Sequence, residues 1–303
     1  MSTTQKIIAA AATTVLLWAS AFPGIRAGLD AYGPGQLALL RYLFASLTMG
    51  VIAVAGRRSF HKPRLRDLPG ICALGALGFA LYHSALNYGQ VTVTSGSASF
   101  LTESAPIFAT LLAVLFLGER LSAIGWTGLA VCLGGAGLIA VGEANGPLAM
   151  EPGALLILLA AVSGAGYFTL QKSFLRRYGS MEITAYAMWA GTLLMSVWAP
   201  GLTTQVATAP LEATLAVAYI GVFPGAIGYV TYAYVLSELS VARGTSLLYL
   251  VPLAVIPIAW VWHGEVPTLA ALAGGALILV GVALVQRKGR PKRVPAAHEK
   301  TAA

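Results

Sequence analysis

Long apolar runs with almost no charge recur along this chain, and they constrain its fold more than any other feature. About 20 consecutive apolar residues are needed to cross the hydrocarbon core of a membrane. Charged residues make up 10% of the chain, whereas soluble domains carry about 25%. The pattern predicts an all-α polytopic membrane protein with ten transmembrane helices. These helices are expected near residues 7–27, 36–55, 69–89, 96–117, 122–141, 152–172, 181–199, 212–235, 244–262 and 267–286. We expect 7–27 to be the first span rather than a cleaved signal peptide, because the apolar run continues past the A-x-A-like site.

The chain repeats itself at a shift of 146 residues. "ESAPIFATLLAVLFLGE" begins at Glu103 and "YLVPLAVIPIAWVWHGE" begins at Tyr249. Each stretch has a proline followed, thirteen residues later, by Gly-Glu. Glu119 and Glu265, which end the two stretches, are interpreted as turn-forming residues. The repeat predicts one five-helix unit over 1–146, a second over 147–288, and a disordered basic tail over 289–303.

An odd number of helices per unit means that the second unit enters the membrane from the opposite side. Basic residues gather in cytoplasmic loops. With the N-terminus inside, every Lys and Arg except Arg26 and Arg41 falls in an inside segment, and the outside loops have none. The sequence therefore predicts inverted repeats with both termini cytoplasmic. The net charge of +8 then reflects orientation and favours contact with anionic membrane lipids rather than nucleic acid.

Inverted repeats are typical of secondary transporters, whose site lies near the membrane midplane between the two units. "LLWASAFPGIRAGLD" in the first span resembles the opening of the drug/metabolite transporter superfamily, EamA branch. "LGERLSAIGWTGLAVCLGGAGLIAVG" and "HGEVPTLAALAGGALILVGVALV" resemble the end of each repeat in that family. The resemblance implies a multi-pass carrier of the bacterial inner membrane that exports amino acids, aromatic or broad in range. Another small metabolite, a cationic drug or a lipid head group remain alternative cargoes.

His83 and Glu103 are interpreted as the only ionisable side chains well inside spans, with Arg41 near the outer end of its span. Helical spacing puts His83 on one face with Tyr82 and Asn87, and Glu103 on one face with Ser99. A carboxylate and an imidazole on neighbouring helices can bind a substrate ammonium group or relay a proton. The alternative is an interhelical hydrogen bond that holds the bundle together. Proton coupling therefore stays open. The substrate-binding candidates from this pair of helices are Tyr82, His83, Asn87, Ser99 and Glu103.

The repeat adds aromatic candidates from the second half. A shift of 146 residues carries His83 onto Tyr229 and Glu103 onto Tyr249. A site that straddles the two-fold axis would have polar or aromatic residues at such matched positions. Aromatic rings suit apolar side chains and attract ammonium groups, although Tyr and Trp are also common at the lipid interface. The aromatic candidates are Trp18, Tyr167, Tyr229, Tyr232 and Tyr249.

Pro106, Pro224 and Pro252 fall within spans, where proline kinks a helix. Such kinks either widen a central cavity or bend the helices for packing. The small-residue runs "GGAGL" and "GGALILVG" favour close packing of the fifth and tenth spans, within one chain or across a dimer. The protein is therefore expected to be a monomer or a homodimer.

Other classes of function lack their motifs. An intramembrane enzyme would need paired aspartates, a zinc-binding H-E-x-x-H motif or a serine nucleophile with its base, and the sequence has none of these. A nucleotide-binding G-x-x-x-x-G-K loop is also absent. We expect no cofactor and no metal. An intramembrane enzyme remains the alternative from a different class.

Overall fold

The computed structural model describes residues 2–55, 60, 62–117, 122–143, 151–175, 177–238 and 247–288, and every regular element in these ranges is a helix. The first half contains α1 (Thr3–Leu29), α2 (Pro34–Ala55), η1 (Leu65–Asp67), α3 (Leu68–Gly75), η2 (Ala76–Leu81), α4 (Tyr82–Gly89), α5 (Ser95–Thr102), α6 (Ala105–Leu117) and α7 (Ala123–Gly142). The second half contains α8 (Pro152–Phe174), α9 (Ser180–Leu194), η3 (Met195–Trp198), α10 (Leu202–Thr208), α11 (Leu211–Val222), η4 (Phe223–Ile227), α12 (Gly228–Glu238), η5 (Leu247–Leu250), α14 (Val251–His263) and α15 (Leu269–Lys288). The expected turn at Glu119 and the expected tail 289–303 lie outside the described residues.

Several of these helices are long and apolar enough to cross a membrane. In the described part of the chain there are six such stretches, and two further apolar helical stretches are shorter. The prediction of an all-α, polytopic membrane protein is confirmed, while the count of ten spans stays a prediction. The six are Thr3–Leu29, Pro34–Ala55, Leu65–Gly89, Ala123–Gly142, Pro152–Gln171 and Leu211–Val235, and the shorter two are Leu247–His263 and Leu269–Val285.

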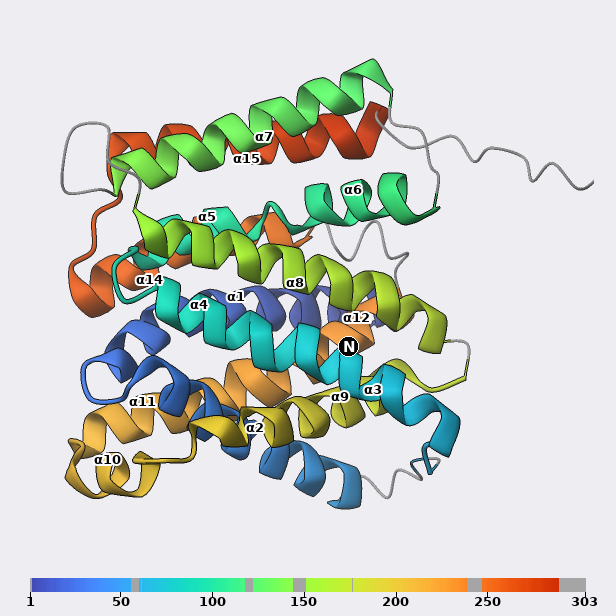
Figure 1. The fold of residues 1–303 in the computed structure, drawn as a ribbon, viewed down its shortest axis with the longest axis vertical. Helices are drawn as coiled ribbons and strands as arrows, with labels where there is room; N and C mark the ends of the chain where they lie inside the picture. The colour runs from blue at the N-terminus through green and yellow to red at the C-terminus, as the bar shows by residue number, and fades with distance from the viewer. Residues whose placement is uncertain are drawn as a thin grey trace, which may run out of the picture.

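The two halves interleave. In Figure 1, α7 and α15 lie together at one end of the molecule, and α2 and α10 lie at the other. Between these ends, α1 packs against α11, α12 and α14, while α8 packs against α4, α5 and α6. The first long helix of each half therefore contacts helices of the other half, and the space between them belongs to both.

Glycines bring α7 and α15 into close contact. A Cβ atom added at Gly128 would lie 2.7 Å from the carbonyl oxygen of Gly281, and one added at Gly135 would lie 2.5 Å from that of Gly274. The contacting residue number falls along α15 as it rises along α7, so the two helices run antiparallel. Of the two packing alternatives, the structure has the one within a single chain.

Irregular turns occur at matched positions in the two halves. The π-helical segments η2 (Ala76–Leu81) and η4 (Phe223–Ile227) nearly coincide when shifted by 146 residues. Likewise, the turn at Glu103 and Ser104 between α5 and α6 corresponds to the 3-10 segment η5 before α14. Discontinuous helices at corresponding positions of two repeats are the usual place of a transporter's binding site.

The three candidate prolines lie at these irregular turns. Pro106 is the second residue of α6, and Pro252 is the second residue of α14. The missing N–H of proline has no helical partner in a first turn, so proline is well tolerated there. Pro224 lies in the π-helical segment η4. Where the sequence predicts kinks within spans, the structure therefore has helix starts at Pro106 and Pro252 and a π turn at Pro224.

A short helix, α10, lies in a segment that the sequence predicts to be a loop. Gly201, with φ of 79°, precedes it in the left-handed conformation that glycine adopts easily. The side chain of Gln205 accepts a hydrogen bond from the Gly33 amide at 3.0 Å. The helix thus joins the α9–α11 connection to the α1–α2 connection, a contact that local sequence patterns do not reveal.

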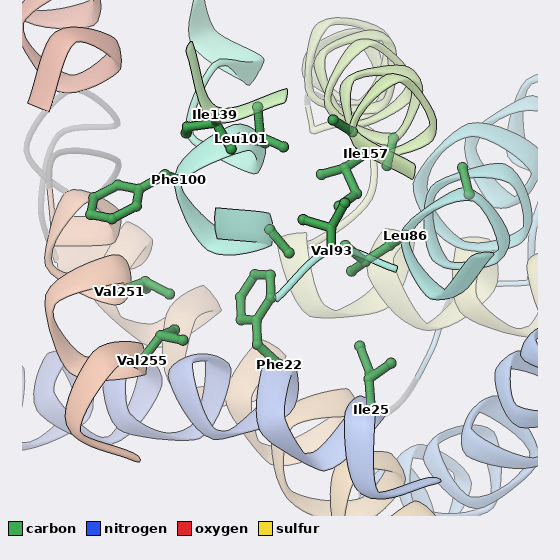
Figure 2. Close-up of a cluster of buried hydrophobic side chains, with 14 of the residues drawn as sticks. Phe22, Ile25, Leu86, Val93, Phe100, Leu101, Ile139, Ile157, Val251 and Val255 are labelled. Carbon is green, nitrogen blue, oxygen red and sulfur yellow. The ribbon is translucent and has the colours of Figure 1, made fainter. Parts of the chain in front are cut away.

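Buried side chains from both halves form the core. Figure 2 shows Phe22 and Ile25 on α1 near Leu86 on α4, with Val251 and Val255 on α14 in the same cluster. In lipid, water exclusion does not drive helices together, so close packing of such side chains does. The core therefore holds the halves in one arrangement around the space between them.

Candidate functional site

A cavity of about 320 Å³ lies between the two halves. The first half lines it with residues of α1, α2, η2, α4, α5 and α6, and the second half with residues of α8, α12, η5 and α14. Pockets that hold small molecules typically measure about 300–1,000 Å³, so the size suits a small metabolite. The sequence-predicted residues that line it are Trp18, Tyr82, His83, Glu103, Pro106, Tyr167, Tyr229 and Tyr249.

Aromatic rings from both halves form part of the cavity wall. The Trp18 and Tyr229 rings meet edge to face with centroids 5.3 Å apart. Behind the wall, Phe79 packs against Tyr167 at 5.7 Å and Tyr229 at 5.6 Å. Edge-to-face pairs such as Trp18–Tyr229 and Phe79–Tyr167 are favourable. The wall is thus rigid and apolar, and suits an aromatic or aliphatic side chain of a substrate.

Side chains from other helices hold the two π-helical segments that flank the cavity. The Trp18 indole Nε1–H donates to the carbonyl oxygen of Pro224 in η4 at 3.2 Å. The Ser163 hydroxyl donates to the carbonyl oxygen of Leu77 in η2 at 2.7 Å. Each bond crosses from one half to the other. π turns occur frequently at functional sites, and here they directly precede cavity residues.

His83 lines the cavity, but neighbouring side chains occupy both of its ring nitrogens. Arg41 Nη1 lies 3.4 Å from Nδ1, and the Tyr42 hydroxyl bonds to Nε2. Because a guanidinium can only donate, Nδ1 accepts, and the neutral ring then donates from Nε2 to the Tyr42 oxygen. This arrangement fits the interhelical hydrogen bond that the sequence left as an alternative, and it makes His83 a support for Arg41.

Arg41 is the charged cavity residue that sequence reasoning missed. The sequence placed it near the outer end of a span. Arg41 nevertheless contacts His83 and lines the same cavity, so His83 and Glu103 are not the only ionisable side chains there. Arg41 lies within α2, is 3% exposed and lines the cavity. No described residue forms a hydrogen bond with its Nε. One feature of the sequence could have found it, since Arg41 was one of two basic residues outside the predicted cytoplasmic segments.

Glu103 lies in the turn between α5 and α6 and lines the same cavity. Its backbone N–H donates to the carbonyl oxygen of Phe100 at 3.2 Å. Within the described residues its carboxylate forms no hydrogen bond and no ion pair. The cavity wall therefore holds an acidic group that has no hydrogen-bond or ion-pair partner among the described residues.

Three predicted site residues do not reach the cavity. Asn87, fully buried, donates from Nδ2 to the carbonyl oxygen of Pro34 at 3.1 Å and ties α4 to α2. Ser99 donates to the carbonyl oxygen of Gly96 at 2.6 Å within its own helix. Tyr232 packs against Trp18 with ring centroids 4.9 Å apart, outside the cavity wall. The positions of these three side chains are therefore determined by packing between and within helices, and not by the cavity.

A polar network joins α1 to the ends of α4 and α14. Arg26 Nη1 donates to the carbonyl oxygens of Gln90 at 2.7 Å and Val91 at 3.1 Å. Arg26 Nε also lies 3.8 Å from Glu265 Oε1, and Glu265 Oε2 accepts the Ser95 amide at 2.9 Å. Glu265 thus caps the start of α5, a role that goes beyond the turn-forming one expected for it.

Two more bonds extend this network towards the cavity wall. Gln90 Nε2 donates to the carbonyl oxygen of Phe22 at 3.1 Å, and His263 Nε2 lies 2.9 Å from that of Pro23. Phe22 itself lines the cavity. The network therefore fastens the first half to the second directly beside the cavity.

The model of the EamA-like transporter family matches the chain twice, over residues 5–141 and 151–287. The chain belongs to the EamA-like transporter family. This EamA-like transporter is a multi-pass membrane protein and not an enzyme. The resemblance read from "LLWASAFPGIRAGLD" and from the glycine-rich repeat ends is confirmed.

Relatives of this EamA-like transporter match along nearly their whole length. A protein of Streptantibioticus cattleyicolor named as a probable terminal-alkyne amino-acid exporter is 44% identical over 289 residues, which cover 95% of this chain and 96% of the relative. An uncharacterized transporter of Bacillus subtilis, YdfC, is 41% identical over 285 residues, covering 94% and 92%. A solved crystal structure with 21% identity covers 94% of this chain and 97% of its own, with a TM-score of 0.61, and supports the fold.

Proposed function

We propose that this transporter exports amino acids, aromatic and hydrophobic ones or a broad range, and related metabolites from the cell across its inner membrane. The observation that carries the proposal is the cavity, whose walls come from matched positions of the two halves. His83 and Tyr229 are such a pair, and Glu103 and Tyr249 are another. The relative named as a probable amino-acid exporter supports the substrate class.

The proposed topology is two inverted five-helix repeats, over 1–146 and 147–288, with ten spans and both termini in the cytoplasm. The antiparallel contact of α7 and α15 supports inversion, because Gly128 and Gly274 are equivalent at a shift of 146 residues, as are Gly135 and Gly281. Two equivalent helices that run in opposite directions are what an inverted repeat produces. The distribution of Lys and Arg supports the same orientation.

Transport is proposed to proceed by alternating access. The network of Arg26, Gln90 and Glu265 then holds the outer end of the cavity closed, because in this topology α1 ends at the outer face. An outward-facing state would require the Arg26–Glu265 ion pair, which joins the two halves, to separate. An alternative cargo is a cationic drug or amine metabolite, which the carboxylate of Glu103 favours because no described residue pairs with it.

Purified protein in liposomes tests the function. Efflux of a labelled amino acid is measured in competition with each of the twenty amino acids, with and without a pH gradient. We expect competition by several amino acids, strongest for those with aromatic or aliphatic side chains, and a dependence on the gradient only if transport is coupled to protons. Flux of cationic amines without flux of any amino acid would favour the alternative cargo. Absence of all flux from a folded, reconstituted protein would contradict the carrier itself.

A further inference from the structure

The cavity contains two side chains of opposite charge that are not paired with each other. Among the described residues, the Arg41 guanidinium has one hydrogen-bond partner, His83 Nδ1, and its Cζ lies over the Tyr42 ring, 5.4 Å from the centroid. Glu103 has no partner for its carboxylate among the described residues. Ionisable groups within membrane spans are costly, and almost always pair with another group or mark a substrate path. Within the described ranges, neither side chain has an oppositely charged partner.

We propose that Arg41 binds the carboxylate of the transported amino acid and that Glu103 binds its ammonium group. This inference rests on the proposed function and names what the site recognises, a zwitterion. A guanidinium binds a carboxylate through parallel hydrogen bonds, which a lysine cannot reproduce. One ligand with both charges satisfies both side chains at once, and neither an amine nor a carboxylic acid does so.

The surroundings of Arg41 favour this role. His83 takes a bond from Nη1 alone, and no other nitrogen of Arg41 has a partner within the described residues. The Tyr42 hydroxyl fixes the other side of the His83 ring, so the imidazole is a rigid support for the guanidinium. His83 is thus a positioning residue that acts through Arg41.

The aromatic wall completes the recognition. Trp18, Tyr167 and Tyr229 line the same cavity and have no formal charge to offer a ligand. They suit the apolar side chain of an amino acid whose two charged groups are held by Arg41 and Glu103. Selectivity for the zwitterion and selectivity for the side chain therefore come from different residues, and can be tested separately.

The test uses three probes in proteoliposomes: the amino acid with the largest flux, its decarboxylated amine and its deaminated acid. For phenylalanine these are phenethylamine and 3-phenylpropionate. Inhibition constants are measured for the full-length protein and its variants. We expect the wild type to bind the amino acid about 30-fold more tightly than either analogue, because leaving a buried charge unpaired costs binding strongly.

The variants assign each charge to its group. Arg41→Gln should weaken binding of the amino acid by about 30-fold and leave the amine unchanged. Glu103→Gln should weaken the amino acid similarly and leave the carboxylic acid unchanged. Retained binding of the unaffected analogue shows that each variant is folded. If Arg41→Gln does not fold, Arg41→Lys keeps the charge without the planar fork and should still lose most of the affinity for the amino acid.

Exposed residues provide matched controls. Arg66→Gln and Glu212→Gln remove the same charges from exposed positions outside the cavity and should change no constant. The inference is overturned, with amino-acid transport intact, if the wild type binds amine and amino acid equally or if both cavity variants affect all three probes alike. Absence of binding and flux for every amino acid would overturn the proposed function together with it.

Discussion

Replacing Gly135 with alanine should force α7 and α15 apart. The new Cβ would lie 2.5 Å from the Gly274 carbonyl oxygen, 2.9 Å from Leu277 Cβ and 3.0 Å from the Ile278 amide nitrogen. Carbon atoms in ordinary contact are about 3.5–4.0 Å apart, so the helices must separate by about 1 Å. Two of the three nearest atoms belong to backbone and have no rotamer that relieves the clash. Overpacking of this kind costs about 1–3 kcal/mol.

The neighbouring Gly134 provides the control, because a Cβ there meets nothing within 4 Å. Alanine favours a helix over glycine by about 1 kcal/mol at either position, so the difference between the two variants isolates the clash. The assay is the midpoint temperature of the monodisperse peak in detergent after heating. For large domains 1 kcal/mol shifts the midpoint by about 2–4 °C, so the cost of about 1–3 kcal/mol should make Gly135→Ala melt about 2–12 °C below Gly134→Ala. Equal midpoints would refute the close packing of α7 and α15.

Three further predictions concern other contacts. Glu265→Gln removes the ion pair with Arg26 and should speed the labelling, by an impermeant maleimide added outside, of a cysteine placed at Ala21 in the cavity wall. Tyr229→Ala opens the aromatic wall and should lower flux of an aromatic amino acid at least about ten-fold, since buried aromatic rings dominate such contacts, while Tyr229→Phe keeps most of it. Asp67→Asn removes the ion pair with Arg177 and should lower the midpoint temperature in detergent.

Each of these can be checked against a control or a contrary outcome, and an unchanged midpoint in Asp67→Asn would count against the third. Glu212→Gln, at an exposed carboxylate, should leave maleimide labelling unchanged. Asp30→Asn, at another exposed carboxylate, should leave the midpoint unchanged. Equal labelling rates with and without Glu265 would mean that the network does not restrict access. Full flux in Tyr229→Ala would remove that ring from the site.

Periodicity and length predicted most of the helices because each is a local property. The apolar runs of α1, α2, α7 and α8 appear in the sequence as such, and the helices begin and end near the residues expected. The duplicated "GGAGL" and "GGALILVG" runs likewise indicated the close approach of two distant helices. Family membership followed from motifs that are also local.

The candidate site was only partly predictable, because a cavity depends on how helices are rotated against one another. Glu103 and Tyr229 were found from polarity and from the repeat. Asn87 and Ser99 are polar as well, yet they bond to backbone carbonyls in the packed structure. Arg41 was assigned from its distance to the end of a span, and that distance does not show which side of the helix faces the centre.

The π-helical segments set a further limit on predicting which residues share a helix face. Spacing rules assume an unbroken α-helix, and η2 at 76–81 interrupts one just before Tyr82 and His83. No composition marks the interruption, which is maintained by partners on other helices such as Ser163. A face drawn across such a turn from i, i+3 and i+4 spacing therefore loses its register.

In these π-helical segments, the number of residues in the turn determines where the cavity side chains that follow it point. A π turn holds one residue more than an α turn. If η2 tightened into an α turn, the chain beyond it would rotate by about 100° about the helix axis. The rings of Tyr82 and His83, which directly follow η2, would then point away from the cavity. A single-residue insertion or deletion in either π-helical segment would therefore reorient several cavity side chains at once. Such changes could alter the range of transported substrates in one step during evolution.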